Sequence, residues 1–384
     1  MNEPIPLART ELGPREEELL LEVVRSGSLS LGPKLEQFEQ DFGEWLGGGY
    51  AVAVSSGTAA LHLGVRAMGW GQGDEVITSP LSFVATANSI LYEGGKPVFC
   101  DIDPVTFNVD PSTVAAAVTD ATAGILPVHI FGYPADLPAL AEVASERGLG
   151  MMEDAAQALG AVDLMGRRIG TAGNIATFAF YANKQMTTGE GGVLVTPQRE
   201  VAERVRSERN QGRAPDMAEV EHNRIGFNYR LSDLQAAIGI AQIERIGELL
   251  DTRDNVADLY RERLIQLGAA AAGENDDHDV VLPCENRGDE RRSWFVFVVQ
   301  LPLGVDRDAV ISSLAQNGIA SKAYLPCIHL LPPYRERFGF VGGEFPIAER
   351  VSERSLALPF FTSMTESQVD RVCTALGEAL GRQP

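Results

Sequence analysis

The run AVAVSS at residues 51–56 opens a series of short apolar stretches that decides how this chain folds. Six more follow up to residue 196: EVITSP (75–80), PVFCDI (97–102), AGILPVHIF (123–131), GMMEDA (150–155), ATFAFYA (176–182) and GGVLVT (191–196). Helical patterns separate them, such as the amphipathic stretch 135–147, which Gly148 ends. Continuous apolar strands that alternate with helices predict an α/β fold with a mostly parallel sheet covered on both faces.

The second half of the chain has a different pattern. A long helical stretch covers residues 231–267 and is followed by the polar segment GENDDHD (273–279). Beyond it the sequence predicts a strand (293–301), a helix (307–318), a Pro-rich loop (325–334) and a closing helix (365–380). We therefore expect a large domain over residues 1–250, with the N-terminal segment packed on it, and a small α+β domain over residues 251–384.

Composition excludes several classes of function. The 32 Lys and Arg residues against 53 Asp and Glu residues give a net charge of −21, which disfavours binding to nucleic acids and to anionic membranes. No apolar stretch reaches the roughly 18 residues of a membrane helix, and the N-terminus lacks the features of a signal peptide. The four scattered cysteines have no metal-ligand spacing. We expect a cytoplasmic protein with reduced thiols and no metal.

Lysine is scarce, which narrows any chemistry that needs an amine. Of the four lysines, only Lys184 lies between an apolar strand and a Gly-rich turn, TTGEGG (187–192). This position predicts that it lies where strand ends meet a crevice. A buried lysine loses its charge readily and can bond an aldehyde cofactor. A solvated loop lysine is the ordinary alternative.

Two polar residues lie in GMMEDAAQALG (150–160), where a predicted strand ends. The carboxylate of Asp154 is placed to keep a cofactor's pyridine nitrogen protonated, and Gln157, three residues on, is placed to reach the ring hydroxyl. A helix N-cap is the common alternative for such an aspartate.

Two further segments suit a phosphorylated aromatic cofactor. SSGT (55–58) opens a helix, so Gly57 and Thr58 present free N–H groups and a positive dipole end to a phosphate, although such caps are also common without a ligand. Phe83 follows the strand EVITSP and is either a ring that stacks on a cofactor or an ordinary core residue.

Taken in order, seven segments resemble the sugar aminotransferases of the DegT/DnrJ/EryC1/StrS family, which are fold-type I enzymes dependent on pyridoxal phosphate. They are LGPKLEQFEQDF (31–42), SSGTAAL (55–61), SFVATANSI (82–90), EDAAQALGA (153–161), Lys184 with TTGEGG after it, GFNYRLSDLQAAIG (226–239) and FPIAERVSERSLALPFF (345–361). The resemblance covers nearly the whole chain. It implies a large domain with a mixed, mostly parallel sheet between helices and a small C-terminal α+β domain.

The resemblance also implies roles for matching residues. Lys184 would hold pyridoxal 5'-phosphate and move the proton between substrate and cofactor. Asp154 would pair with the pyridine nitrogen and Gln157 with the ring hydroxyl. Phe83 would lie against the ring, and Gly57 would bind the phosphate together with Thr58.

The motif GFNYRLSDLQAA implies a shared active site. Asn228 would reach the cofactor phosphate of the neighbouring subunit, which requires a homodimer. Arg230 in the same turn and His329 in the loop LPCIHLL are candidates for substrate contact, with a polar turn and an ordinary loop histidine as the alternatives. Two positions depart from the family: Ala179 stands where a phosphate-binding serine is usual, and Leu159 where a histidine is common.

The expected reaction is a two-stage amino transfer. An amino acid, expected to be L-glutamate, loads the cofactor with an amino group, which then passes to a keto group of a nucleotide-linked sugar. The turn TTGEGG is more similar to members that aminate C4 than to those that aminate C3. Sugar-dehydrating members replace the lysine with histidine, so Lys184 disfavours that alternative. A regulatory, non-catalytic protein would not need Lys184, Asp154 and Gln157 together.

Overall fold

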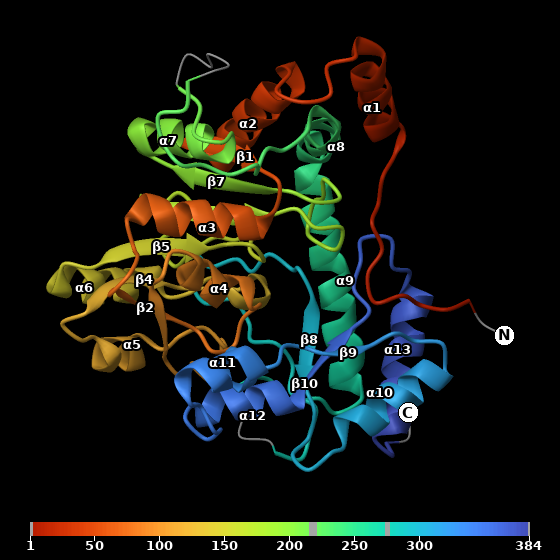
Figure 1. Ribbon diagram of the computed structural model, residues 1–384. Helices are drawn as coiled ribbons and strands as arrows, with labels where there is room; N and C mark the ends of the chain where they lie inside the picture. Colours follow the sequence, from red (N-terminus) through yellow and green to blue (C-terminus); the bar gives the residue numbers. More distant parts are fainter. Residues whose placement is uncertain (1–2, 215–220, 273–276, 383–384) are drawn as a thin grey trace.

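The computed structural model describes residues 3–214, 221–272 and 277–382 (Figure 1). Its larger sheet has seven strands in the order β1-β7-β6-β5-β4-β2-β3. The strands are β1 (Tyr50–Val54), β2 (Glu75–Thr78), β3 (Lys96–Phe99), β4 (Thr122–Leu126), β5 (Gly150–Asp154), β6 (Ile175–Ala179) and β7 (Gly192–Thr196). All pairs are parallel except those of β7, which runs antiparallel to both β1 and β6. The predicted α/β fold with a mixed, mostly parallel sheet is confirmed.

The reversed strand β7 brings three strand ends to one edge of the sheet. Gly192, the first residue of β7, pairs with Ala179 at the end of β6 and with Val54 at the end of β1. The connection between β6 and β7 therefore leaves this edge and returns to it. Asp154, the last residue of β5, pairs with Thr177 next to the same edge. Side chains from distant parts of the chain are brought together there.

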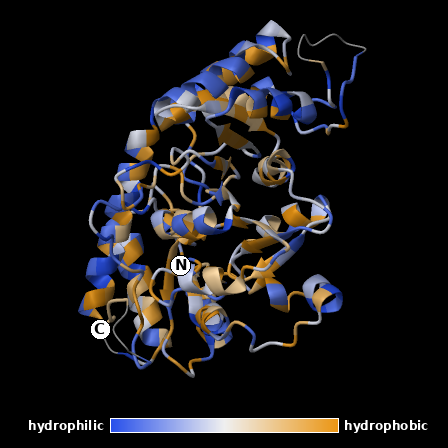
Figure 2. Ribbon diagram, turned by 90° about the vertical axis from the view of Figure 1, so that its left-hand side faces the viewer, coloured by the Kyte–Doolittle hydropathy of each residue, from blue (hydrophilic) through white to orange (hydrophobic). Residues whose placement is uncertain are grey.

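The strands carry apolar side chains on both faces of the sheet, and helices cover both faces. On one face Val52 and Val54 pack with α3, and on the other Ala51 and Ala53 belong to the cluster that includes Phe38 of α2. Figure 2 shows helices that carry hydrophobic and hydrophilic residues together, as expected of helices with one buried face. The helices of this part are α1 (Pro14–Ser26), α2 (Pro33–Leu46), α3 (Gly57–Met68), α4 (Ala85–Tyr92), α5 (Pro111–Ala117), η1 (Ile130–Gly132), α6 (Leu137–Arg147) and α7 (Arg199–Arg209).

The long helical stretch predicted over 231–267 is two helices, α8 (Asp233–Glu244) and α9 (Ile246–Gln266). Arg245 between them has φ −122°, outside the helical range. Its side chain instead donates to Glu16, at 2.9 Å. The helix thus breaks where a long-range ion pair fixes one residue, a contact that local periodicity does not contain.

The C-terminal part has a three-stranded antiparallel sheet in the order β8-β10-β9. Its elements are β8 (Phe297–Gln300), α10 (Arg307–Gln316), β9 (Lys322–Ala323), η2 (Ile328–Leu330), α11 (Pro332–Phe338), α12 (Pro346–Arg354), β10 (Ser355–Leu358) and α13 (Glu366–Ala379). Residues 273–276 of the polar segment lie outside the described residues. Among the described residues, no helix is long and apolar enough to cross a membrane.

The N-terminal residues pack in two places. Ile5 forms a parallel bridge with Ile319 and belongs to the apolar cluster of the C-terminal part, whereas α1 and α2 pack against α8, which lies within the predicted large domain. The assignment of the N-terminal segment to the large domain stays a prediction. Helix α9 continues through residue 250, with Leu249 in one cluster and Val256 in the other, and the predicted boundary there stays a prediction.

Candidate active site

Lys184 lies in the connection between β6 and β7, at the edge where the strand ends meet. Several contacts hold this connection. Near the lysine, Lys184 N donates to Tyr181 O at 2.9 Å, Arg253 Nη2 donates to Lys184 O at 3.1 Å, and Thr10 Oγ1 donates to Ala182 O at 2.7 Å. Lys184 therefore lies on a turn whose backbone is bonded by α9 and by the N-terminal segment.

The amine of Lys184 is half-buried against an aromatic ring. Its Nζ lies 3.8 Å from the centroid of Phe295, which precedes β8. Burial lowers the pKa of Lys184 to about 8, and the smaller opposing effect comes from the Asp154 carboxylate. A lysine with such a pKa is partly neutral near physiological pH, which lets it act as a nucleophile and accept a proton.

Asp154 ends β5 and is buried. Its Oδ2 accepts a 2.6 Å hydrogen bond from Thr86 Oγ1, and its Oδ1 accepts from Ala156 N at 3.1 Å. Burial raises the pKa of Asp154, while these two hydrogen bonds and Lys184 act in the opposite direction. No helix starts directly after Asp154, so the N-cap alternative does not apply.

Gln157 is fixed by contacts with two loops. Its Oε1 accepts from Phe131 N at 3.0 Å, and its backbone carbonyl accepts from Gln185 Nε2 at 2.7 Å. With Oε1 engaged, the side chain presents its NH₂ group as a donor. Gln157 is thus tied to the turn that carries Lys184.

The start of α3, residues 56–58, is closely packed at the same edge, and we call this segment the Gly57 cup. Ser56 caps the helix, with its Oγ accepting from Ala59 N at 3.1 Å. A Cβ on Gly57 would lie 2.5 Å from Ala179 Cβ, so only glycine fits there. The first N–H groups of a helix have no partner within it, and they suit an anion. Thr58 is half-buried beside Gly57.

The Phe83 side chain is 59% exposed, which excludes the core alternative. It lies between β2 and α4, next to Ser82. The Oγ of Ser82 is 2.9 Å from Thr86 Oγ1, the hydroxyl that donates to Asp154. Phe83 is therefore an exposed aromatic ring next to the hydrogen bonds that connect Ser82, Thr86 and the Asp154 carboxylate.

The turn with Asn228 and Arg230 runs along the end of β1. Arg230 bridges Val54, and Ser55 N donates to Tyr229 O at 2.8 Å, next to the start of α3. Asn228 is exposed. The guanidinium of Arg230 donates to Asn210 Oδ1 at 3.0 Å, a contact that fixes it within its own subunit.

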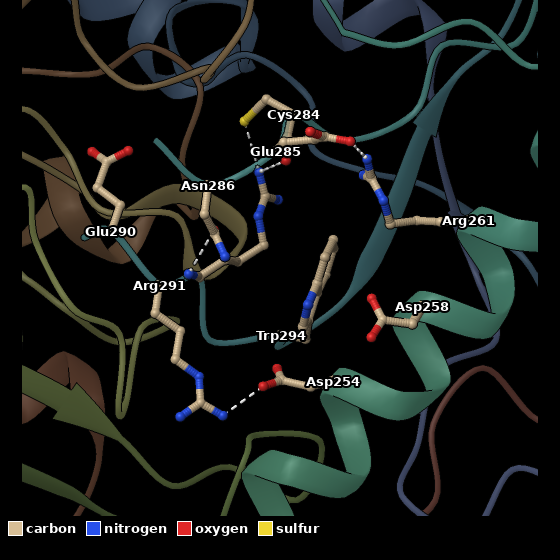
Figure 3. Close-up of a pocket in the computed structure, with 10 residues that line it drawn as sticks. Asp254, Asp258, Arg261, Cys284, Glu285, Asn286, Glu290, Arg291 and Trp294 are labelled. Atoms are coloured by element: carbon tan, nitrogen blue, oxygen red, sulfur yellow. Dashed lines mark hydrogen bonds and ion pairs between the residues drawn. The ribbon is translucent and has the colours of Figure 1, made fainter. Parts of the chain in front are cut away.

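A separate pocket of about 490 Å³ lies between α9 and the segment 283–294 (Figure 3). Its charged groups pair with one another, as Arg261 does with Glu285 at 2.7 Å and Arg291 with Asp254 at 2.5 Å. None of the residues predicted for the active site lines this pocket. The active-site candidates gather instead around the edge described above.

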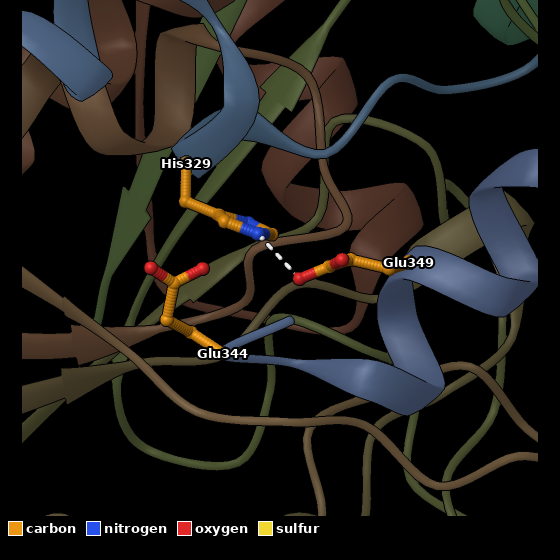
Figure 4. Close-up of side chains that lie close together, drawn as sticks. All are labelled: His329, Glu344 and Glu349. Atoms are coloured by element: carbon orange, nitrogen blue, oxygen red, sulfur yellow. Dashed lines mark hydrogen bonds and ion pairs between the residues drawn. The ribbon is translucent and has the colours of Figure 1, made fainter. Parts of the chain in front are cut away.

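His329 is placed differently from a residue that borders the substrate. The ring is fully buried, lies 4.8 Å from the ring of Phe345, and its Nε2 is 3.0 Å from Glu349 Oε1 (Figure 4). With Glu344, these side chains hold ligand-type atoms within 4.8 Å of one another. Backbone N–H groups of the surrounding loop already donate to both glutamates. Because His329 is fully buried, its side chain is not accessible to a substrate.

Sequence reasoning missed three residues at the site. Thr86 lies in α4, three residues after Phe83 in SFVATANSI, but it is buried whereas Phe83 precedes the helix and is exposed, so nearness in sequence was the one signal for it. Phe295 and Arg253 reach Lys184 from far along the chain, and no local pattern announced them. Leu159, where the resemblance suggested a histidine, is buried in the core.

Comparisons with known proteins agree with this arrangement. A family model described as the DegT/DnrJ/EryC1/StrS aminotransferase family matches residues 10–377. GDP-perosamine synthase of Caulobacter vibrioides is 37% identical over 379 residues, with 98% of each chain covered. The spore coat polysaccharide biosynthesis protein SpsC of Bacillus subtilis is 36% identical over 392 residues, covering 98% of this chain and 97% of its own.

Two solved structures are similar over nearly the whole chain. DesV of S. venezuelae has a TM-score of 0.90 and 33% identity, with 100% of both chains covered. A putative sugar aminotransferase of Streptococcus pneumoniae in its PMP form has a TM-score of 0.90 and 25% identity, with 98% of both chains covered.

Proposed function

Because the chain belongs to the DegT/DnrJ/EryC1/StrS aminotransferase family, we propose that it moves an amino group from L-glutamate, by way of pyridoxal 5'-phosphate, to C4 of a nucleotide-linked keto sugar. That it is an aminotransferase follows from the family; the donor, cofactor, sugar and carbon are the proposal. The observation that carries it is the meeting of Lys184, Asp154 and the Gly57 cup at one edge of the sheet.

The residues at this edge fit pyridoxal phosphate. Gly57 lets the start of α3 pack closely against Ala179, and the N–H groups of a helix start suit a phosphate. The partly neutral amine of Lys184 suits an aldehyde, and the buried carboxyl group of Asp154 suits a pyridine nitrogen. When bound, the cofactor supplies an electron sink for the substrate carbon that loses a proton.

Each residue then has a distinct task. Lys184 would anchor the cofactor covalently and, when free, would accept the proton from the substrate carbon and return it. Asp154, oriented by Thr86, would keep the pyridine nitrogen protonated. Gln157, whose Oε1 is engaged by Phe131 N, would donate its amide N–H to the ring oxygen, and Phe83 would lie against the ring. Gly57 and Thr58 would donate their N–H groups to the phosphate.

Support for the sugar substrate comes from the relatives. One is a GDP-perosamine synthase and another acts in spore coat polysaccharide biosynthesis, as their names state. Amination at C4 rests on the turn TTGEGG (187–192). A C3 aminotransferase is the nearest alternative, and the position of the new nitrogen in the product distinguishes the two.

We further propose a homodimer with shared active sites. Two observations support this proposal: Asn228 is exposed, although its backbone bridges Asn210, and its turn lies beside the start of α3. In this arrangement Asn228 donates its side-chain amide to the phosphate held by the partner subunit. Arg230 fixes the same turn from within its own subunit and contacts the substrate only if its bonds to Asn210 rearrange.

The test follows the cofactor and then the product. Purified protein supplied with pyridoxal phosphate should absorb visible light. Excess L-glutamate without a sugar acceptor should remove this absorbance and release one keto acid per active site. The bleached protein should then aminate nucleotide-linked 4-keto sugars, with the C–N bond placed by NMR. Bleaching without transfer to any nucleotide-linked keto sugar would contradict the sugar assignment. Failure of glutamate and of other amino acids to bleach the protein would contradict the proposed chemistry itself.

A further inference from the structure

His62 links the helix that forms the phosphate cup to the turn that carries Asn228. It lies on α3 and is buried, with Nε2 2.8 Å from Glu93 Oε1 and Nδ1 3.1 Å from the hydroxyl of Tyr229. A carboxylate only accepts, so Nε2 carries the proton in the neutral ring and Nδ1 accepts from Tyr229. Tyr229 directly follows Asn228 in the chain.

Both neighbours of Asn228 are held against this histidine. The rings of Phe227 and Tyr229 stack with centroids 4.9 Å apart and planes 10° apart, and the His62 ring lies 4.8 Å from that of Phe227. Arg66, one turn further along α3, lies over Phe227 at 5.6 Å. The stacked pair is therefore clamped on the α3 side, while Asn228 between them is exposed.

Ion pairs fix Glu93, the carboxylate that contacts His62. Arg66 contacts Glu93 at 2.9 Å and Glu208 at 3.0 Å. The backbone of Glu208 accepts in turn from Phe227 N at 2.6 Å. The network thus connects α3, the end of α4 and the end of α7 to a single turn. A turn with this many fixed contacts loses little further freedom when it binds a ligand, which favours tight binding.

We propose that His62 is a positioning residue that fixes the turn of Asn228 and thereby sets how tightly the partner subunit retains its cofactor. The inference rests on the shared active site proposed above. Helix α3 then serves two sites at once. Its first residues form the phosphate cup of their own subunit, and His62 on the next turns holds the residue that reaches the other phosphate.

Two variants break the link in different ways. Tyr229→Phe removes only the hydroxyl and keeps the stacked ring, whereas His62→Phe keeps a ring and removes both polar atoms. Each should weaken retention about threefold to tenfold, the range given by the loss of one neutral hydrogen bond. The double variant should be hardly weaker than either single one, since both remove the same contact. His62→Asn, which keeps a polar atom near the Nδ1 position, should restore most of the affinity.

A matched control lies next to the network. The ring of Tyr92 packs edge-on against His62 at 5.2 Å, and it is 53% exposed. Tyr92→Phe removes a hydroxyl from a neighbour of the same histidine without touching the turn. It should leave cofactor retention unchanged, and thermal unfolding should show that every variant compared is folded.

Hybrid dimers locate the effect. One subunit carries Lys184→Ala with His62→Phe or Tyr229→Phe, and its differently tagged partner is wild type. Only the wild-type subunit can bond the cofactor through lysine, so the absorbance of lysine-bound cofactor, titrated to equilibrium, reports on that site alone. Compared with a hybrid carrying Lys184→Ala only, its affinity should fall threefold to tenfold. Placing the His62 or Tyr229 change in the Lys184-bearing subunit should have no such effect.

The outcomes separate the two proposals. If Asn228→Ala weakens the partner's site but neither His62→Phe nor Tyr229→Phe does, the positioning role is wrong and the shared site stands. If both changes act only in their own subunit, His62 serves its own phosphate cup and the inference is overturned. If Asn228→Ala also acts only in its own subunit, the shared site falls and this inference falls with it.

Discussion

Thr86 Oγ1 donates a 2.6 Å hydrogen bond to Asp154 Oδ2, and through it α4 holds the carboxyl group at the end of β5. A hydroxyl has one proton to give, so Ser82, 2.9 Å away, must donate to Thr86. The hydrogen bond lowers the pKa of Asp154 against the larger, raising effect of burial. Thr86 therefore helps to keep a buried carboxyl group ionised.

Replacing Thr86 by valine, which has nearly the same shape, should remove this bond and raise the pKa of Asp154. The protonated acid cannot stabilise a positive pyridine ring, so the acid limb of the kcat/KM profile should move to higher pH. A hydrogen bond to a charged group contributes about 1.5–3 kcal/mol, which corresponds to roughly 10- to 100-fold in rate. Ser82→Ala, which loses only the outer bond, should have a smaller effect in the same direction. A Thr86→Val profile that overlays the wild-type one would refute this role.

Asp154→Asn tests the carboxyl group itself. The amide has a similar shape but no charge, so it should reduce the rate of amino transfer far more than it reduces cofactor affinity. Single-turnover rates at saturating cofactor isolate the chemical step, and a loss of at least about 100-fold is expected from a charged group acting on a transition state. Equal single-turnover rates for the two proteins would show that the proton on the ring does not depend on this residue.

The sheet, and the position of Lys184 and Asp154 at its strand ends, could be predicted because the signals are local. Each apolar run of the first half contains most of one strand, although the strand is shorter than the run. Asp154 lies at the end of one such run, and Lys184 lies shortly after another. The Gly-rich turn after Lys184 likewise marks a return to the sheet edge. Strand ends and glycines are properties of consecutive residues, which periodicity and turn chemistry capture.

What the sequence could not show depends on contacts between distant segments. Phe295 reaches Lys184 only because the C-terminal part folds back onto the sheet edge. The helix break at Arg245 follows from its ion pair with Glu16, more than two hundred residues earlier. The full burial of His329 follows from the rings of Phe340 and Phe345, which close over a loop that looked open in the sequence.

Lys184→Ala should abolish turnover and leave the fold intact, because under the proposed function the side chain would be a covalent anchor and a proton carrier rather than a packing element. A single acid–base group contributes roughly 10²–10⁴ in rate, so at least a 10³-fold loss is expected once the anchor is lost as well. Lys96→Ala is the matched control, since Lys96 is exposed and forms an ion pair with Glu75. The checks are steady-state rates and circular dichroism. Near wild-type transfer by Lys184→Ala would mean that another lysine is the anchor.

The ionisation of Lys184 can be measured directly because the chain has only four lysines. In cofactor-free protein labelled with ¹³C at lysine Cε, one resonance should titrate with a pKa of about 8, and it should be missing in Lys184→Ala. Burial disfavours the charged form of the amine, which is the reason for this expectation. A spectrum in which no lysine resonance titrates near 8 would contradict the desolvated amine.

Ala179 makes the dependence on Asn228 testable in a second way. It packs on Gly57, at the position where the family resemblance implies a phosphate-binding serine, so under the proposed function this protein would have one phosphate donor fewer and should rely more on Asn228. Mixing Lys184→Ala protein with Asn228→Ala protein under subunit exchange creates dimers in which one site has both lesions and the other has neither, so activity should rise above that of both parents. Ala179→Ser should supply the missing donor and reduce the loss that Asn228→Ala causes in cofactor affinity, by about threefold to tenfold for one hydrogen bond. If subunit exchange is verified by tags and the mixture shows only the mean of its parents, Asn228 acts within its own subunit. If Ala179→Ser leaves the Asn228→Ala loss unchanged, the two positions do not serve the same phosphate.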